Sequence, residues 1–360
     1  MINVTKTFLP PIEEYTKQVK RAWDNQWITN RGELVLELEE KLKNYLSVSN
    51  ILITNNGTIP LQIALKLLGK EGEIITTPFS YVATTSAIVW ENCTPVFVDI
   101  HPEYLTIDET KIEAAITNKT TAILVTHVFG NPCDVEAIDR IAKKHNLKVI
   151  YDAAHAFGVK VNGKSIFEYG DISTTSFHAT KLFHTTEGGA IITKDAKILR
   201  RISLMRSFGH LSPTTFEGVG INGKNSEFHA AMGLCNLKYI ENILQKRKQQ
   251  VEYYNLRLEG LNVHRQLIHP KSEYNYSYYP IVFESEELLL KVIAELQNYQ
   301  IFPRRYFYPS LNTLSYLKDN ISCTISEKIA RGSLCLPLFY TLSKEEQYMV
   351  CRIILRVQNN

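Results

Sequence analysis

Short apolar runs alternate with helical patterns between residues 50 and 195 of this chain. The apolar runs predict strands at residues 51–54, 74–75, 96–98, 122–125, 148–151 and 190–193. Between them, apolar residues recur three and four positions apart over residues 60–68 and 135–145, which predicts helices. Because the strands are apolar throughout rather than alternating, we expect a mostly parallel sheet that is covered on both faces. The pattern predicts an α/β fold with a large three-layer domain.

The second half of the chain changes character after a long helical stretch over residues 226–259. Residues 264–279 are rich in Tyr, Asn, Ser and Pro, which is typical of a connection between packed units. An apolar run at residues 279–283, a helical pattern over 286–298 and another after Ser343 follow. We therefore expect a large domain over residues 1–250 and a smaller C-terminal α/β domain over residues 251–360.

The composition excludes several classes of function. The formal charge is only +3, and there is no run of five like charges, so nucleic acid and membrane surfaces are poor candidates as partners. The six cysteines are scattered without a CxxC pair, which predicts free thiols and no metal site. The N-terminus has no secretory pattern, and no segment has about 18 consecutive apolar residues. We expect a cytoplasmic protein.

Candidate chemistry is concentrated in Asp152, Ser176 and Lys181. Asp152 directly follows the apolar run 149–151, and ligands gather at the carboxyl ends of strands in such sheets. Lys181 is the only basic group besides two histidines in the polar segment 176–189. A pyridoxal phosphate enzyme needs a lysine for the Schiff base, a carboxylate at the pyridine nitrogen and a hydroxyl at the phosphate. The alternatives are a helix cap or structural carboxylate for Asp152 and a surface lysine for Lys181.

Other residues fit the same site less specifically. Gly57 and Thr58 join a predicted strand to a helix, where backbone amides favour an anion, although an ordinary helix start explains them nearly as well. Tyr81 is a candidate to stack on a planar cofactor or to pack in the core. His155 is either a contact to the cofactor's ring hydroxyl or a core histidine.

Taken together, these motifs resemble the DegT/StrS-type nucleotide-sugar aminotransferases, a branch of the fold-type I pyridoxal phosphate enzymes. The resemblance runs through the whole chain and includes residues 27–32, 56–58, 77–78, 97–99, 127–130, 152–155, 176–181, 187–189, 220–227 and 336–338. It implies an aspartate-aminotransferase-like fold. It also implies Lys181, Asp152 and His155 as catalytic residues, with Gly57, Thr58, Tyr81 and Ser176 as further contacts of the cofactor.

The resemblance also implies a homodimer with shared active sites. A polar residue of the turn at Asn222–Lys224 would reach the phosphate of the other subunit, and either Asn222 or Lys224 could be that residue. The family pattern has an aromatic residue where this chain has Gly223. The candidates for binding the substrates are Thr29, Arg31, His178, Glu187, Arg304, Arg305 and Tyr306.

The function implied is transfer of an amino group from L-glutamate to a keto sugar linked to a nucleotide. Residues 126–134 and 303–309 most resemble the members that convert dTDP-4-keto-6-deoxyglucose to dTDP-4-amino-4,6-dideoxyglucose for O-antigen or another surface polysaccharide. The alternatives are amination at C-3 of a 3-keto sugar nucleotide and a UDP-sugar 4-aminotransferase.

More distant alternatives are a sugar dehydratase that uses pyridoxal phosphate, a non-catalytic regulator and a nicotinamide dehydrogenase. Lys181 argues against the dehydratase, in which a histidine replaces the lysine. The complete set of catalytic residues argues against the regulator. The absence of a GxGxxG motif argues against the dehydrogenase.

Overall fold

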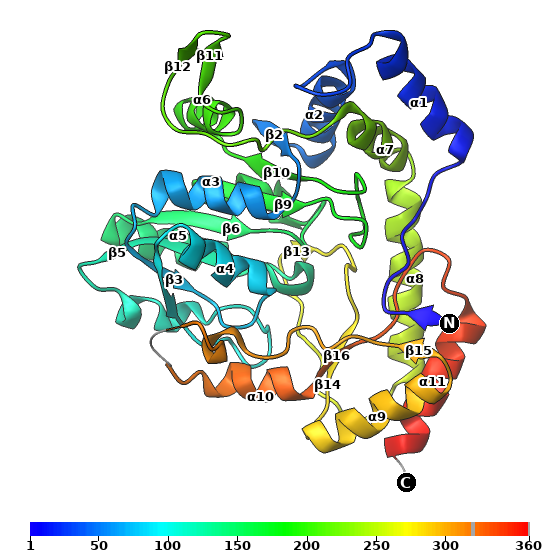
Figure 1. Cartoon of the computed structure of the whole chain (residues 1–360). Helices are drawn as coiled ribbons and strands as arrows, with labels where there is room; N and C mark the ends of the chain where they lie inside the picture. The colour runs from blue at the N-terminus through cyan, green and yellow to red at the C-terminus, as the bar shows by residue number, and fades with distance from the viewer. Residues whose placement is uncertain (318–320, 359–360) are drawn as a thin grey trace.

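A computed structural model describes residues 1–317 and 321–358, and its centre is a seven-stranded sheet (Figure 1). The strand order is β2-β10-β9-β6-β5-β3-β4. Only β10 runs antiparallel to its neighbours, and the other pairs are parallel. The mostly parallel sheet is thus confirmed. The strands span Ile51–Thr54 (β2), Glu73–Thr76 (β3), Thr94–Phe97 (β4), Thr120–Thr126 (β5), Lys148–Asp152 (β6), Ile172–Ser176 (β9) and Gly189–Ile192 (β10).

Helices cover both faces of this sheet, so that the large unit has three layers. Adjacent strand residues belong to different cores: Ile75 packs in a cluster with α2, α5 and α7, while Ile74 packs in a cluster with α3, α4 and α6. This alternation explains the continuous apolar runs, because both faces of each strand are buried. The helices span Glu33–Leu46 (α2), Thr58–Leu68 (α3), Val82–Trp90 (α4), Val135–His145 (α5), Ala196–Met205 (α6) and Glu227–Leu237 (α7).

The C-terminal part has a core of its own around a small antiparallel pair of strands, β14 and β16. The first strand of the chain, β1, pairs in parallel with β15 and adds Ile2 to this core. The elements here span Ile2–Asn3 (β1), Pro280–Val282 (β14), Glu286–Asn298 (α9), Ile301–Phe302 (β15), Thr324–Gly332 (α10), Ser333–Cys335 (β16) and Lys344–Gln358 (α11).

One long helix, α8 (Ile240–Arg257), connects the two cores (Figure 1). Ile240 at its start belongs to a cluster on the large sheet, and Tyr254 near its end belongs to the C-terminal cluster. The expected boundary at residue 250 falls within this helix, and the division into domains 1–250 and 251–360 stays a prediction.

The remaining elements are short or lie at the surface. A hairpin of β11 and β12 projects beside α6, at the far end of the molecule from α9 and α11 (Figure 1). These elements span Ile12–Asp24 (α1), Lys160–Val161 (β7), Lys164–Ser165 (β8), His210–Ser212 (β11), Thr215–Phe216 (β12) and Ser272–Glu273 (β13). Across residues 1–317 and 321–358, we find no helix with the length and apolar character that crossing a membrane requires.

Candidate active site

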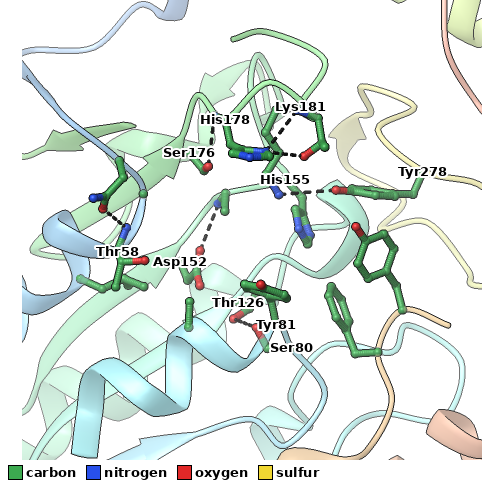
Figure 2. Close-up of a pocket in the computed structure, with 18 of the residues that line it drawn as sticks. Thr58, Ser80, Tyr81, Thr126, Asp152, His155, Ser176, His178, Lys181 and Tyr278 are labelled. Atoms are coloured by element: carbon green, nitrogen blue, oxygen red, sulfur yellow. Dashed lines mark hydrogen bonds between the residues drawn. The ribbon is translucent and has the colours of Figure 1, made fainter. Parts of the chain in front are cut away.

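A cavity of about 240 Å³ lies at the carboxyl ends of β6 and β9. Its walls come from sequence-distant segments: the start of α3, the loops after β6 and β9, and residues 278, 304, 306 and 307 of the C-terminal part. Figure 2 shows Asp152, His155, Ser176 and Lys181 grouped around it. The predicted position at the strand ends follows from the parallel order of β5, β6 and β9.

Lys181 lies on the loop that follows β9, with its side chain partly buried in the cavity wall. Its amine Nζ is 3.5 Å from the hydroxyl of Tyr278. The pKa of Lys181 is lowered to about 8, and burial is the main cause. The charge of Arg304 also lowers this pKa, whereas Asp152 and Tyr81 raise it. The neutral fraction of this amine near physiological pH is therefore much larger than that of an ordinary lysine, which favours a role as nucleophile and proton carrier.

Asp152 ends β6 and is only 5% exposed. Its Oδ1 accepts a hydrogen bond from the backbone N–H of Ala154 at 3.1 Å, and its Oδ2 accepts one from the Thr84 hydroxyl at 2.7 Å. A turn follows the strand, so Asp152 does not cap a helix. The pKa of this carboxyl group is raised, because burial outweighs the two hydrogen bonds and the charge of Lys181, which lower it.

A chain of hydroxyl groups extends from Asp152 beneath the cavity. Thr84 contacts Ser80 at 2.8 Å, and Ser80 contacts Thr126 at 2.9 Å, which brings α4 and β5 into the same network. All three side chains are buried. The network fixes the direction of the carboxylate without adding a charge.

His155 lies in a cluster of aromatic rings beside Lys181. Its Nδ1 accepts a hydrogen bond from the backbone N–H of Phe129 at 3.2 Å, so the proton of the neutral ring lies on Nε2. The ring stacks on Phe307 with centroids 5.6 Å apart and an interplanar angle of 3°. Burial lowers the pKa of His155 strongly, and Lys181 lowers it further. The imidazole ring of His155 is therefore neutral and can donate a hydrogen bond through Nε2.

The opposite end of the cavity is suited to an anion. Gly57 and Thr58 open α3, whose N-terminus carries partial positive charge. A Cβ atom on Gly57 would lie 2.7 Å from Cβ of Ser176, so only glycine allows this close approach. The Ser176 hydroxyl lines the cavity on the other side, and the Asn56 side chain accepts hydrogen bonds from the backbone N–H groups of Thr58 and Ile59.

Four of the predicted substrate residues line the cavity: His178, Glu187, Arg304 and Tyr306. Nε2 of His178 is 3.6 Å from Oε1 of Glu187, and both side chains are about half exposed. The Arg304 guanidinium lies 4.6 Å from the centre of the Tyr306 ring. Within residues 1–317 and 321–358, no carboxylate forms an ion pair with Arg304. Tyr81 also lines the cavity and is 51% exposed.

The other predicted residues lie outside the cavity of this chain. Arg305 forms an ion pair of 2.6 Å with Glu286 and covers the ring of Tyr308. Arg31 forms an ion pair of 2.7 Å with Glu39, and Thr29 is exposed two residues before it.

Nζ of Lys224 donates a hydrogen bond of 2.9 Å to Oδ1 of Asn222. The turn between them lies against α3, where Gly223 approaches Ile59. The Gly223 carbonyl in that turn accepts a hydrogen bond from the backbone N–H of Asn55, close to the end of the cavity that is suited to an anion.

Several residues that line or support the cavity were not predicted as site residues from the sequence. Tyr278 is one of four tyrosines in residues 274–279, and nothing local distinguishes it from the others. Thr84 and Thr126 occur in ordinary helix and strand patterns. Their importance depends on contacts with residues far along the chain, which no local spacing encodes.

Comparison with known proteins identifies the family to which this chain is similar. The model of the DegT/DnrJ/EryC1/StrS aminotransferase family matches residues 11–355. The chain is 42% identical to the dTDP-4-amino-4,6-dideoxy-D-glucose transaminase of Shigella dysenteriae, over 98% of each protein. It is 41% identical to the Escherichia coli protein of the same name, again over 98% of both.

Among solved structures, DesI in the presence of its TDP-sugar product superposes with a TM-score of 0.94. The identity to DesI is 29%, over 99% of this chain and 93% of that one. PseC of Helicobacter pylori, an aminotransferase of pseudaminic acid biosynthesis, superposes with a TM-score of 0.91. Its identity is 26%, over 99% of this chain and 98% of that one.

Proposed function

This chain belongs to the DegT/DnrJ/EryC1/StrS aminotransferase family, and on that basis we propose that it aminates C-4 of a dTDP-linked 4-keto-6-deoxyglucose. It is a sugar-nucleotide aminotransferase that depends on pyridoxal 5'-phosphate. The observation that carries the proposed substrate is the 42% identity to the Shigella transaminase over 98% of both chains. The product is dTDP-4-amino-4,6-dideoxyglucose, with surface polysaccharide such as O-antigen as its proposed destination.

The residues of the cavity fit pyridoxal phosphate. A buried carboxylate whose pKa is raised by burial, as that of Asp152 is, gains from a cationic partner such as a protonated ring nitrogen. Gly57, Thr58 and Ser176 form a cradle of the right kind for a phosphate at the start of α3. Tyr81, half exposed at the wall, has an aromatic face for stacking on the ring. When bound, the cofactor supplies a carbon that accepts the amino group and a ring that withdraws electrons.

Lys181 holds the cofactor and moves the proton. Its pKa of about 8 allows the amine to take a proton from the carbon that loses the amino group and return one to the carbon that gains it. Asp152 keeps the ring nitrogen protonated in both directions. His155, fixed as a donor through Nε2, stabilises a ring oxygen.

We assign recognition of the substrates to the open side of the cavity. Arg304 is a permanent cation without a carboxylate partner among the described residues, which suits the diphosphate of a sugar nucleotide. His178, Glu187 and Tyr306 supply hydrogen-bonding groups for sugar hydroxyls. L-glutamate is the proposed amino donor, and it uses the same cavity in the first half of the reaction.

We further propose a homodimer with shared sites. Trp23, Trp27, Phe208 and Phe216 are large aromatic residues that are between 48% and 70% exposed, which favours burial against a second copy. Asn222 or Lys224 would then reach the phosphate of the other subunit. Mixing a Lys181→Ala protein with an Asn222→Ala or Lys224→Ala protein should restore activity if subunits exchange, because each mixed dimer keeps one intact site.

The experiment that tests the function is an incubation with defined substrates. The purified holoenzyme and glutamate should convert dTDP-4-keto-6-deoxyglucose to the 4-amino sugar, as read by NMR of the product. Substrates carrying UDP in place of dTDP, or a keto group at C-3, should react at least about tenfold more slowly, a difference of about 1.4 kcal/mol in transition-state binding. A preference for either of those substrates would refute the proposed specificity.

A further inference from the structure

Tyr278 is the cavity residue that lies closest to the chemistry among those the sequence did not reveal. Its hydroxyl is 3.5 Å from Nζ of Lys181, and it approaches from the C-terminal part of the chain (Figure 2). The amine of Lys181 is not bonded to the cofactor whenever the amino group being transferred resides there, and this is when Lys181 carries protons.

The backbone around Tyr278 is tied down by buried polar side chains. Asn275 donates to the carbonyl groups of His155 and Phe157 at 2.8 and 3.0 Å, and the Ser277 hydroxyl donates to the same His155 carbonyl at 2.7 Å. The buried guanidinium of Arg247 donates to the Ser277 carbonyl at 3.0 Å. Residues 275–278 are thereby anchored to the loop that carries His155.

The ring of Tyr278 is held as firmly as its backbone. It meets the His155 ring edge-on with centroids 4.8 Å apart, and it meets the Tyr306 ring in the same way at 5.6 Å. These contacts involve the ring alone, so phenylalanine would keep them. The hydroxyl is the one group of this side chain whose loss would be specific to Lys181.

We propose that Tyr278 is a positioning residue that holds the Lys181 amine while Lys181 acts as the proton carrier. This inference rests on the proposed function of Lys181. Burial raises the pKa of Tyr278, so its phenol stays neutral while Lys181 titrates near pH 8. A neutral hydroxyl accepts a hydrogen bond from the ammonium form and donates one to the amine form, so it holds the side chain in both states.

The direction of the effect on Lys181 follows from charge. A hydrogen bond to an ammonium group is stronger than one to a neutral amine, so the hydroxyl favours the protonated form. The other titratable or charged groups that act on Lys181 are Asp152, Tyr81, Arg304 and His155, and a Tyr278→Phe change leaves all of them in place. The pKa of Lys181 should therefore fall in that variant.

The test measures Lys181 itself. The full chain, freed of cofactor, is acylated with a succinimidyl ester at a series of pH values, and labelling of the Lys181 peptide is followed by mass spectrometry. In Tyr278→Phe we expect the apparent pKa of Lys181 to fall by about half a unit. In the holoenzyme we expect kcat to fall about tenfold, with KM for both substrates nearly unchanged.

Tyr306→Phe is the matched control, because its ring packs on Tyr278 but its hydroxyl makes no hydrogen bond to Lys181. It should leave the pKa of Lys181 unchanged. An unchanged pKa in Tyr278→Phe, or equal shifts in the two variants, would overturn the role of Tyr278. Full turnover by Lys181→Ala would instead overturn the proposed function of Lys181, so the two failures can be told apart.

Discussion

The hydroxyl group of Thr84 donates a 2.7 Å hydrogen bond to Oδ2 of Asp152, joining α4 to the end of β6. Both side chains are buried, and Thr84 is linked through Ser80 to Thr126, two residues that line the cavity. The bond lowers a pKa that burial raises. Thr84 thus helps keep Asp152 ionised, although it does not itself line the cavity.

Replacing Thr84 with valine should move the acidic limb of the pH–rate profile to higher pH. Valine keeps the shape but removes the donor, so the pKa of Asp152 rises further and the carboxyl group protonates at a higher pH. Activity well above that pKa should be nearly normal. The measurement is kcat/KM against pH.

The neighbouring Thr85 supplies the control for this variant. It is buried on the same helix, and its hydroxyl has no hydrogen-bond partner within the described residues. Thr85→Val should leave the pH profile where it is. Identical profiles for the wild type and Thr84→Val would mean that this hydroxyl does not influence the ionisation of Asp152.

We expect borohydride to attach the cofactor covalently to Lys181, as read by mass spectrometry of the labelled peptide. Lys181→Ala should abolish turnover and this labelling. Its free energy of unfolding should change little, because the side chain lies at the cavity wall and makes one long hydrogen bond. Lys197→Ala, on the exposed surface of α6, is the control and should behave as wild type. Sugar amination by Lys181→Ala without an added amine would contradict the assignment.

Asp152→Asn should give a folded protein that binds the cofactor but is at least about tenfold slower, a loss of about 1.4 kcal/mol or more. An amide cannot stabilise a protonated ring nitrogen as a carboxylate does. The pKa of Lys181 should also fall, because the charge of Asp152 raises it.

Asp171→Asn is the matched control, because Asp171 lies just before β9 and contacts the end of β6 opposite to Asp152. The Asp171 carboxylate accepts the N–H of Val149 at 2.9 Å and pairs with Lys148 at 2.8 Å, away from the cavity. It should affect stability more than rate. Similar rates for Asp152→Asn and the wild type would make Asp152 a structural residue.

The apolar runs predicted the strands whose residues are apolar on both faces. The sequence motifs predicted Lys181, Asp152, His155 and Ser176 as site residues, and the fold brings these four together. The strand β9 was not predicted, because its sequence Ile-Ser-Thr-Thr-Ser is mostly polar. In the sheet, the hydroxyls of Thr174 and Thr175 donate to the carbonyls of Tyr151 and Ala153. Polar residues are buried there because neighbouring strands supply acceptors, and that depends on the tertiary structure.

Arg304 and Arg305 also show that the role of a residue can depend on tertiary contacts that the sequence does not reveal. The sequence made both equal candidates for the diphosphate, yet adjacent residues in an extended segment point in opposite directions. Arg304 lines the cavity and pairs in the backbone with Cys335, whereas Arg305 pairs with Glu286. Only the tertiary structure reveals which of the two side chains faces the cavity.

This difference makes Arg305 the natural control for Arg304. Arg304→Ala should raise KM for the sugar nucleotide about tenfold or more, because an unpaired guanidinium at the cavity binds an anion strongly, and should change KM for glutamate much less. It should also raise the pKa of Lys181, which the charge of Arg304 lowers. Arg305→Ala should leave both Michaelis constants close to wild type. Equal effects of the two variants would place the diphosphate elsewhere.

The parallel pairing of β1 with β15 has a consequence for the order in which the molecule is made. Residues 2 and 3 are synthesised nearly 300 residues before their strand partners at residues 301 and 302. Throughout most of synthesis this edge has no partner, and Tyr278, Arg304 and Tyr306 are also missing from the cavity wall. Contacts with such a large sequence separation form slowly. A complete cavity for the cofactor therefore has to wait until the C-terminal part of the chain has been made.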